Sequence, residues 1–171
     1  MPTPRHIVPI ETLSAEAFRR YGDVIEASES AEPFSVDEGR ATRYHDLAKV
    51  DVAQQRGHPV VSILRVQPCR LPLQLRLLER HPIGSQAFVP MGSHAYLVVV
   101  AAADTSLDAQ HIRCFRASPG QGVNFARGTW HYSVLPLQSV ADFLVIDRGG
   151  PAAPPNCEER ALDELDVWIQ A

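Results

Sequence analysis

Prolines and glycines divide this chain into short segments along its whole length. Fourteen prolines and ten glycines occur among 171 residues, and the longest apolar run, residues 95–103, spans only nine. Such frequent interruption favours many short strands over long helices. Strand-like runs rich in apolar and β-branched residues lie at 60–66, 86–90, 95–102, 112–117, 123–125, 131–137 and 141–147. Strands at this spacing predict a mainly β protein, either a sandwich or a barrel.

The N-terminal part of the chain predicts one strand and one short helix. Residues 6–10 have the composition of a first strand. Ser14 is a good helix N-cap, Glu16 suits the first helical turn, and Gly22 suits the residue that ends a helix. We therefore expect a helix over residues 15–21.

Other segments differ from this pattern of short strands. Residues 28–39 are polar and mixed, which predicts a surface loop. The run 95–102 is apolar throughout, which is typical of a strand in the middle of a sheet. Residues 149–155 form a Gly/Ala/Pro linker, and 156–168 predict a final strand or short helix.

Composition limits the classes of function. The hydrophobic fraction is 45%, charged residues make up 21%, and the formal net charge is -4. These values are typical of a soluble globular protein, and they disfavour a nucleic-acid-binding protein, which usually carries a basic stripe. A nine-residue apolar run is too short to cross a membrane as a helix, and the N-terminus lacks the apolar centre of a signal peptide. We expect one domain, 1–171, in the cytoplasm, where its three unpaired cysteines would stay reduced.

Two polar clusters, about forty residues apart, contain most of the side chains that could carry chemistry. Glu79, His81 and Gln86 belong to the first cluster, and His131 belongs to the second. If residues 73–81 form one strand, Glu79 and His81 point to the same face. That face would also carry three leucines, giving a barrel with an apolar floor and a polar mouth: Leu73, Leu75 and Leu77.

Imidazole and carboxylate groups together are a common ligand set for a divalent metal. The first cluster also allows a purely structural interpretation. His81 would then cap a turn before Pro82, and Glu79 would pair with Arg76 or Arg80 at the surface. The spacing of the residues alone leaves both interpretations open.

The two clusters resemble the two motifs of the cupin superfamily, which implies a double-stranded β-helix, or cupin-like barrel. In the first motif, Glu79 stands at a histidine position and Gln86 at the glutamate position. In the second motif, His131 matches the histidine, and Leu135 replaces an asparagine. Two histidines and one glutamate still make a set that a first-row metal ion accepts.

A second resemblance, to ureidoglycolate lyases, extends over nearly the whole chain. The residues that carry it lie in the blocks 9–10, 18–25, 42–47, 62–65, 77–90, 119–124, 130–131, 142–148 and 156–159. The resemblance implies a cupin-like homodimer that cleaves (S)-ureidoglycolate to glyoxylate and urea in allantoin breakdown. It also implies a divalent metal, nickel or another first-row ion, although catalysis without a metal is the alternative.

This family resemblance suggests roles for particular residues. Glu79, His81 and His131 would be the catalytic residues and the metal ligands, or without a metal the acid–base groups. Gln86 could hydrogen-bond the ureido group, which offers both donors and an acceptor. Asn124 is open to a structural or a substrate-binding interpretation.

The substrate carboxylate requires a cation, and the chain has a single lysine. An arginine suits a carboxylate because its guanidinium can donate two parallel hydrogen bonds. Arg43, Arg65 and Arg148 lie in the matching blocks and are the candidates, although Arg65 could instead form a structural ion pair.

Two rival functions fit the same sequence features. The first is a ureidoglycolate amidohydrolase, which would release ammonia in place of urea. The second is a non-catalytic cupin that binds a small carboxylate. Because a fold by itself does not determine a function, the substrate rests on the family resemblance.

Overall fold

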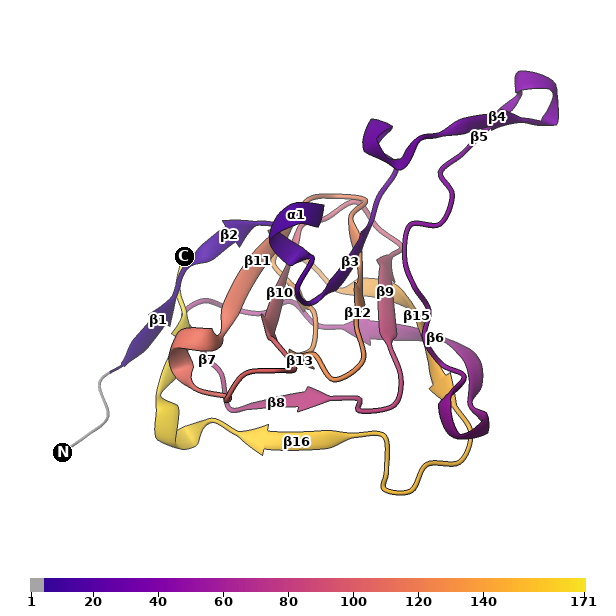
Figure 1. Ribbon diagram of the computed structural model, residues 1–171. Helices are drawn as coiled ribbons and strands as arrows, with labels where there is room; N and C mark the ends of the chain where they lie inside the picture. The colour runs from indigo at the N-terminus through magenta and orange to yellow at the C-terminus, as the bar shows by residue number, and fades with distance from the viewer. Residues whose placement is uncertain (1–4) are drawn as a thin grey trace.

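The computed structural model describes residues 5–171, and it is built almost entirely from short strands (Figure 1). The expectation of a mainly β protein with a short N-terminal helix is confirmed. What we expected of the extreme N-terminus concerns residues 1–4, which lie outside the described part. No helix among the described residues is long and apolar enough to cross a membrane.

A seven-stranded sheet forms the centre of the molecule. Its strand order is β16-β8-β13-β10-β11-β2, and β14 pairs with the other half of β10. The strands are β2 (Ile10–Thr12), β8 (Leu77–Arg80), β10 (Tyr96–Ala101), β11 (Arg113–Ala117), β13 (Trp130–His131), β14 (Leu135–Pro136) and β16 (Glu158–Ala161). Every residue of β10 is buried, as the continuous apolar run predicted.

Two further sheets cover the two faces of this central sheet. The five-stranded sheet has the order β3-β12-β9-β15-β6, and the three-stranded sheet has the order β1-β17-β7. The five strands are β3 (Gly22–Ile25), β6 (His58–Val66), β9 (Gln86–Pro90), β12 (Gly122–Phe125) and β15 (Ala141–Gly149); the three are β1 (His6–Val8), β7 (Leu73–Gln74) and β17 (Val167–Ile169).

Alternating residues of β10 therefore pack into two separate cores. Val98 and Val100 lie in a cluster with Phe88, Phe115 and other side chains between the central and five-stranded sheets. Their neighbours, Leu97 and Val99 among them, lie in a second cluster against the three-stranded sheet. Because successive side chains of a strand point to opposite faces, a strand buried on both faces must be apolar throughout.

The prediction that Leu73, Leu75 and Leu77 share one strand face with Glu79 is wrong. Residues 73–81 form two separate strands, β7 and β8, in different sheets. Leu75 and Leu78 are fully buried in the second core, whereas Leu77, which shares the parity of Glu79, is 37% exposed. The side chains on the Glu79 face of β8 are therefore not a continuation of a leucine floor.

Three other segments also differ from expectation. The helix α1 (Ala15–Phe18) is one turn long; Ser14 caps it by accepting from the Ala17 N–H, but the helix ends before residue 21. The first strand divides into β1 and β2 on either side of Pro9, because proline has no N–H to donate to a ladder. Residues 28–39 contain part of a hairpin, β4 (Phe34–Val36) with β5 (Ala41–Arg43), in place of an irregular loop.

Candidate active site

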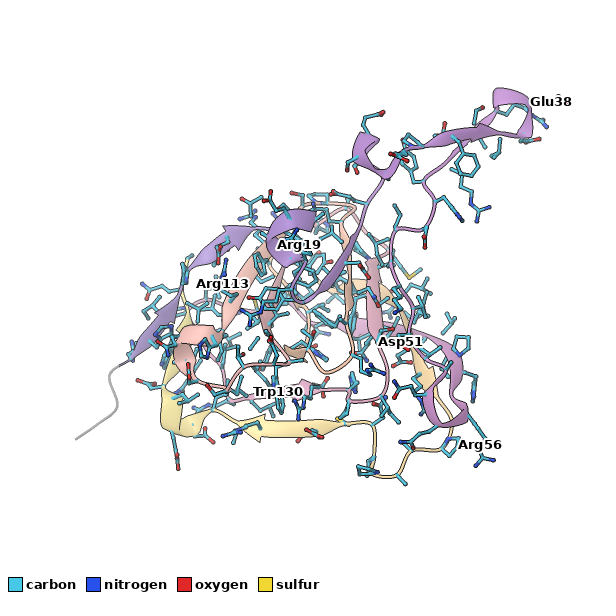
Figure 2. All side chains as sticks on the ribbon, viewed as in Figure 1. Arg19, Glu38, Asp51, Arg56, Arg113 and Trp130 are labelled. Atoms are coloured by element: carbon cyan, nitrogen blue, oxygen red, sulfur yellow. The ribbon has the colours of Figure 1, made fainter. Side chains whose placement is uncertain are left out.

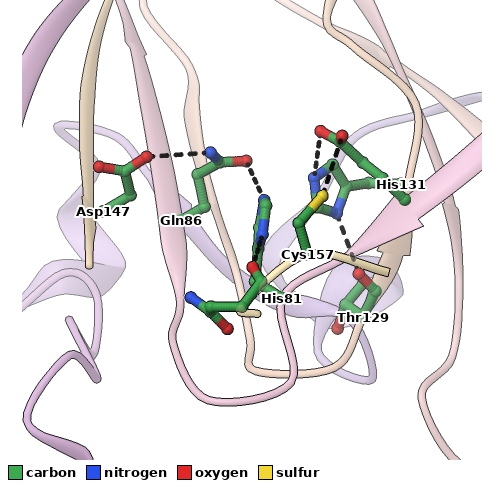
Figure 3. Close-up of polar contacts among 8 residues, drawn as sticks. His81, Gln86, Thr129, His131, Asp147 and Cys157 are labelled. Atoms are coloured by element: carbon green, nitrogen blue, oxygen red, sulfur yellow. Dashed lines mark hydrogen bonds and ion pairs between the residues drawn. The ribbon is translucent and has the colours of Figure 1, made fainter. Parts of the chain in front are cut away.

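Side chains from the strands β8, β9 and β13 and from the loop after β8 come together in one polar cluster (Figure 3). Glu79 on β8 lies directly opposite His131 on β13 in the strand register. His81 follows β8 immediately, and Gln86 begins β9. Ligand atoms of Glu79, His81 and His131 all lie within 4.8 Å of one another. The tertiary structure thus joins the two sequence clusters, as the cupin resemblance implied.

The imidazole of His131 is held in one tautomer. Its Nδ1 lies 3.0 Å from the carbonyl oxygen of Thr129, and because a carbonyl only accepts, Nδ1 carries the proton. The ring is 1% exposed and stacks on Phe125 with centroids 4.3 Å apart. Its Nε2 is buried and has no hydrogen-bond partner among the described residues, although Glu79 Oε1 lies 3.4 Å away. In the neutral ring, Nε2 therefore presents a free lone pair.

His81 is oriented in the same way by a different carbonyl. Its Nδ1 donates to the backbone oxygen of Asn156 at 2.7 Å, and its Nε2 faces Gln86 Oε1 at 3.2 Å. The Asn156 side chain also accepts from the N–H of Ile83, which fixes the loop that follows His81. His131 directs Nε2 toward the carboxylate of Glu79, and a ring nitrogen of His81 lies within 4.8 Å of the same group.

The carboxylate of Glu79 is ionised at neutral pH. A hydrogen bond from the His131 ring, when that ring is charged, lowers the pKa of Glu79. Partial burial opposes this, and positive charge on His131 and His81 adds to the lowering. Cys157 donates its thiol to Glu79 Oε2 at 3.8 Å. Desolvation and the carboxylates of Glu79 and Glu159 raise the pKa of this thiol, so it stays protonated at neutral pH.

These groups fit a divalent metal ion. Two imidazoles and one carboxylate offer ligand atoms within 4.8 Å of one another, and the buried Nε2 of His131 has no hydrogen-bond partner among the described residues. Carbonyl oxygens on the two Nδ1 atoms are the outer contacts that usually orient histidine ligands. The donor set of nitrogen and oxygen suits a first-row transition metal.

Gln86 is oriented by Asp147, a residue that the sequence did not single out for the site. The Gln86 amide nitrogen donates to Asp147 Oδ2 at 3.2 Å. Asp147 does not pair with its neighbour Arg148, because successive residues on β15 point to opposite faces of the sheet. No sequence signal connects residues 86 and 147, because only strand pairing in the five-stranded sheet brings them together.

A pocket of about 480 Å³ opens beside the cluster, and Arg148 is the arginine on its wall. The Arg148 guanidinium donates to the backbone carbonyl oxygens of residues 54, 55, 150 and 151. It therefore braces two loops around the pocket. The other lining residues include His81, Ser85, Asp147, Gly150, Asn156 and Cys157.

The structure does not bring the remaining candidates to this pocket. Arg65 on β6 pairs with Asp142 at 2.8 Å on an exposed part of the sheet. Six positions along β15 separate Asp142 from Arg148, a distance of about 20 Å. Arg43 lies on β5, in the projecting hairpin.

Asn124 also lies away from the cluster, on the other side of its strand. Val123 and Phe125 point into the first core, so Asn124 faces outward. Its amide donates to Asp23 Oδ2 and to the backbone oxygen of Lys49, both at 2.9 Å. These bonds hold the segment around Lys49 against the sheet, which is a structural role.

The arginines near Glu79 also have other partners. Arg76 pairs with Asp163, and Arg80 pairs with Glu158 and lies over the Trp130 ring. The surface pairing considered for Glu79 is therefore not formed, and its carboxylate points to His131.

Comparison with known proteins gives one consistent result. A family model described as ureidoglycolate lyase matches residues 5–170. A protein named ureidoglycolate lyase from Burkholderia mallei (strain NCTC 10229) is 48% identical over 160 residues, which cover 94% of this chain and 91% of that protein. A protein with the same name from Burkholderia cepacia is 44% identical over 157 residues, which cover 92% of this chain and 87% of that protein. Another, from Escherichia coli (strain SMS-3-5 / SECEC), is 44% identical over 155 residues, which cover 91% of this chain and 94% of that protein.

Proposed function

Because this chain belongs to the ureidoglycolate lyase family, we propose that it cleaves (S)-ureidoglycolate to glyoxylate and urea during allantoin breakdown. The observation that carries the proposal is that ligand atoms of Glu79, His81 and His131 lie within 4.8 Å of one another beside a pocket. The substrate comes from the family relationship, and the cluster supplies groups suited to its chemistry.

The reaction requires two proton movements around one carbon atom. The α-carbon of the substrate carries a carboxylate, a hydroxyl and a ureido nitrogen. Removing the hydroxyl proton allows the C–O bond to become a carbonyl while the C–N bond breaks. The departing nitrogen takes up a proton, so the products are glyoxylate and neutral urea. Proton transfer by positioned side chains contributes about 10²–10⁴-fold in rate.

The Nε2 atoms of His81 and His131 are suited to accept and return these protons. In the neutral form of each ring the proton sits on Nδ1, where a backbone carbonyl accepts it, so Nε2 is the nitrogen that can accept a proton. The Glu79 carboxylate stabilises positive charge on either ring. In the alternative with a metal, Glu79, His81 and His131 would instead hold a divalent ion such as nickel, which would supply Lewis acidity that lowers the pKa of the substrate hydroxyl.

Gln86 and Asp147 are suited to bind the ureido end of the substrate. The Gln86 oxygen accepts hydrogen bonds, as does the Asp147 carboxylate, and a ureido group carries N–H donors. Asp147 lies on the pocket wall, and Gln86 donates to it from the adjacent strand β9. Arg148 shapes the same wall by holding the loops of residues 54–55 and 150–151.

We further propose that the enzyme acts in the cytoplasm as a homodimer on a small molecule, without nucleic-acid or membrane partners. The free cysteines support a cytoplasmic location, and the acidic net charge of -4 supports the absence of a nucleic-acid partner. The exposed apolar side chains of Val61 and Ile63 support a homodimer.

Product analysis with (S)-ureidoglycolate tests the proposed reaction. Purified protein should release urea and glyoxylate in equal amounts above the spontaneous rate. His131→Ala should lose most of this turnover. His111→Ala is the matched control, because His111 is partly exposed and contacts Ser106 and Asp108 away from the cluster. Ammonia without urea would show an amidohydrolase. No release from folded, metal-supplemented protein would favour a binding protein.

A further inference from the structure

The β4–β5 hairpin, which we call the arm, projects away from the rest of the molecule (Figure 1). Its two strands pair only with each other among the described residues. Figure 2 shows its side chains spread into solvent, with Glu38 at the tip. Phe34 on β4 is 43% exposed. Because an isolated two-stranded hairpin is marginally stable in water, the arm needs a surface to pack against.

The outer face of the five-stranded sheet carries an apolar surface of this kind. Val61 and Ile63 on β6 are 65% and 54% exposed. They lie directly opposite Ile146 and Leu144 on β15, so the four side chains share one face. We call these four residues the patch. Contiguous exposed apolar side chains usually mark a site of association, and β6 is an edge strand of this sheet.

The patch lies on the same strand as the pocket wall. Arg148 is two positions beyond Ile146 on β15 and therefore points to the same face as the patch. A second copy that covers the patch would thus also approach the pocket opening. A closed dimer of identical chains places the same surface of each copy against the other, so both pockets would be approached equally.

The pocket itself lacks an available cation for the substrate carboxylate. Arg148 is its lining arginine, and its guanidinium is already engaged by backbone oxygens. Asp147 on the wall is acidic, and Glu79 lies nearby. In contrast, Arg43 on the arm has no side-chain hydrogen bond or ion pair among residues 5–171, whereas Arg40 on the same arm is paired with Asp37.

We propose that two copies of this chain associate through the patch, and that the arm of each copy brings Arg43 to the pocket of the other. The assignment of Arg43 to the substrate carboxylate rests on the proposed function. The docking of the arm does not rest on that function. It follows from the hairpin that packs on no other strand among the described residues, from the apolar patch, and from the opposite charges of Arg43 and the pocket. The guanidinium fits an acidic pocket that must receive an anion.

Cross-linking tests the docking independently of activity. Cys157 is an exposed thiol on the pocket wall, so Arg43→Cys places a second thiol on the arm. A short bis-maleimide should give a covalent dimer in which mass spectrometry finds the introduced thiol linked to Cys157 of the partner subunit. The link should vanish when Cys157→Ser is added. Arg20→Cys, on the body beside Asp104, should give no such dimer.

The outcome that overturns the docking is equally clear. A link within a single chain would show that the arm folds onto its own pocket. Absence of any link, in a variant that is folded by circular dichroism, would also reject the proposal. Val61→Asp combined with Ile63→Asp should convert the dimer to a monomer in light scattering. A wild-type protein that is a monomer would reject the inference at once.

Mixing two weakened variants tests the role of Arg43 in catalysis. Arg43→Ala should raise KM at least about tenfold, because a charge-assisted hydrogen bond to the carboxylate is lost. Glu79→Gln should lose turnover. After the subunits exchange, half of the dimers are mixed, and each mixed dimer has one pocket with both groups intact. Activity should therefore recover to about one quarter of wild type.

No recovery, with mixed dimers confirmed by mass, would show that Arg43 does not act in the partner pocket. If wild-type protein shows no lyase activity but the cross-link forms, the proposed function fails and the arm exchange stands. If activity is present and the cross-link is absent, the proposed function stands and the arm exchange fails.

Discussion

The amide nitrogen of Gln86 donates to the carboxylate of Asp147, which leaves the amide oxygen facing His81. A carboxylate only accepts, so Asp147 determines which end of the Gln86 amide points away from it. The oxygen and His81 Nε2 are then two acceptors 3.2 Å apart. A proton, a substrate N–H or O–H, or a metal ion between them would satisfy both. Asp147 therefore sets up the binding function of Gln86.

Asp147→Ala should weaken both metal and substrate binding by about 10–100-fold, the usual effect of removing an outer partner of a site. The reason is that the Gln86 amide becomes free to rotate and present its NH₂ group to the cluster. Isothermal titration with nickel would measure metal affinity, and steady-state kinetics would measure KM.

Asp147→Asn separates positioning from charge. Its carbonyl can still accept from Gln86, so it should recover most of the lost metal affinity. Asp163→Ala serves as the control, because Asp163 pairs with exposed Arg76 away from the site. Unchanged nickel affinity in Asp147→Ala would contradict the positioning role.

Nickel should stabilise the folded protein against heat. A ligand that binds only the folded state adds about 2.7 kcal/mol when its concentration is 100 times Kd. Thermal unfolding followed by circular dichroism, with and without nickel, would show a higher Tm. The shift should disappear in Glu79→Gln, because that variant lacks the carboxylate of the cluster. An equal shift in the variant would place the ion elsewhere.

Glu79 should make the stability of the metal-free protein depend on pH in the acid range. Contact with His131 lowers the pKa of Glu79 in the folded state from its ordinary value of 4.5. The charged carboxylate therefore favours folding above pH 4.5, and this contribution is lost as pH falls through the lower folded pKa. Urea unfolding at neutral and acidic pH should show a smaller loss of stability in Glu79→Gln than in wild type. Identical pH dependence in both proteins would show that the pKa of Glu79 is not lowered.

Gly22→Ala should destabilise the fold by about 3 kcal/mol or more, among the larger effects of single substitutions. A Cβ atom at this position would lie 1.8 Å from the backbone oxygen of Asn124, and φ is +148°. Gly92→Ala is the control, because its Cβ would meet no atom within 4 Å and should change stability by less than about 0.5 kcal/mol. Chemical unfolding would compare the two, and a similar loss in both variants would contradict the steric argument.

The sequence predicted the central strand and the helix cap well because both depend on local patterns. Every residue of the run in β10 is apolar, so both faces of that strand must be buried. The Ser14 side chain accepts from the Ala17 N–H, three residues away in the chain. The prediction from the sequence failed at residues 73–81. Alternating leucines there indicate a strand, but they cannot show that the chain passes from one sheet to another within this segment. A period of two describes the direction of side chains only while the strand continues.

The sequence by itself determined the chemical groups of the site: Glu79, His81, Gln86 and His131, within two recognisable motifs. Only the tertiary structure decided that their atoms meet, because pairing of β8 with β13 and of β9 with β15 joins segments far apart in the chain. It also decided the tautomers, through carbonyls of Thr129 and Asn156. Local sequence patterns specify which strands can form, whereas long-range strand register specifies which side chains face one another.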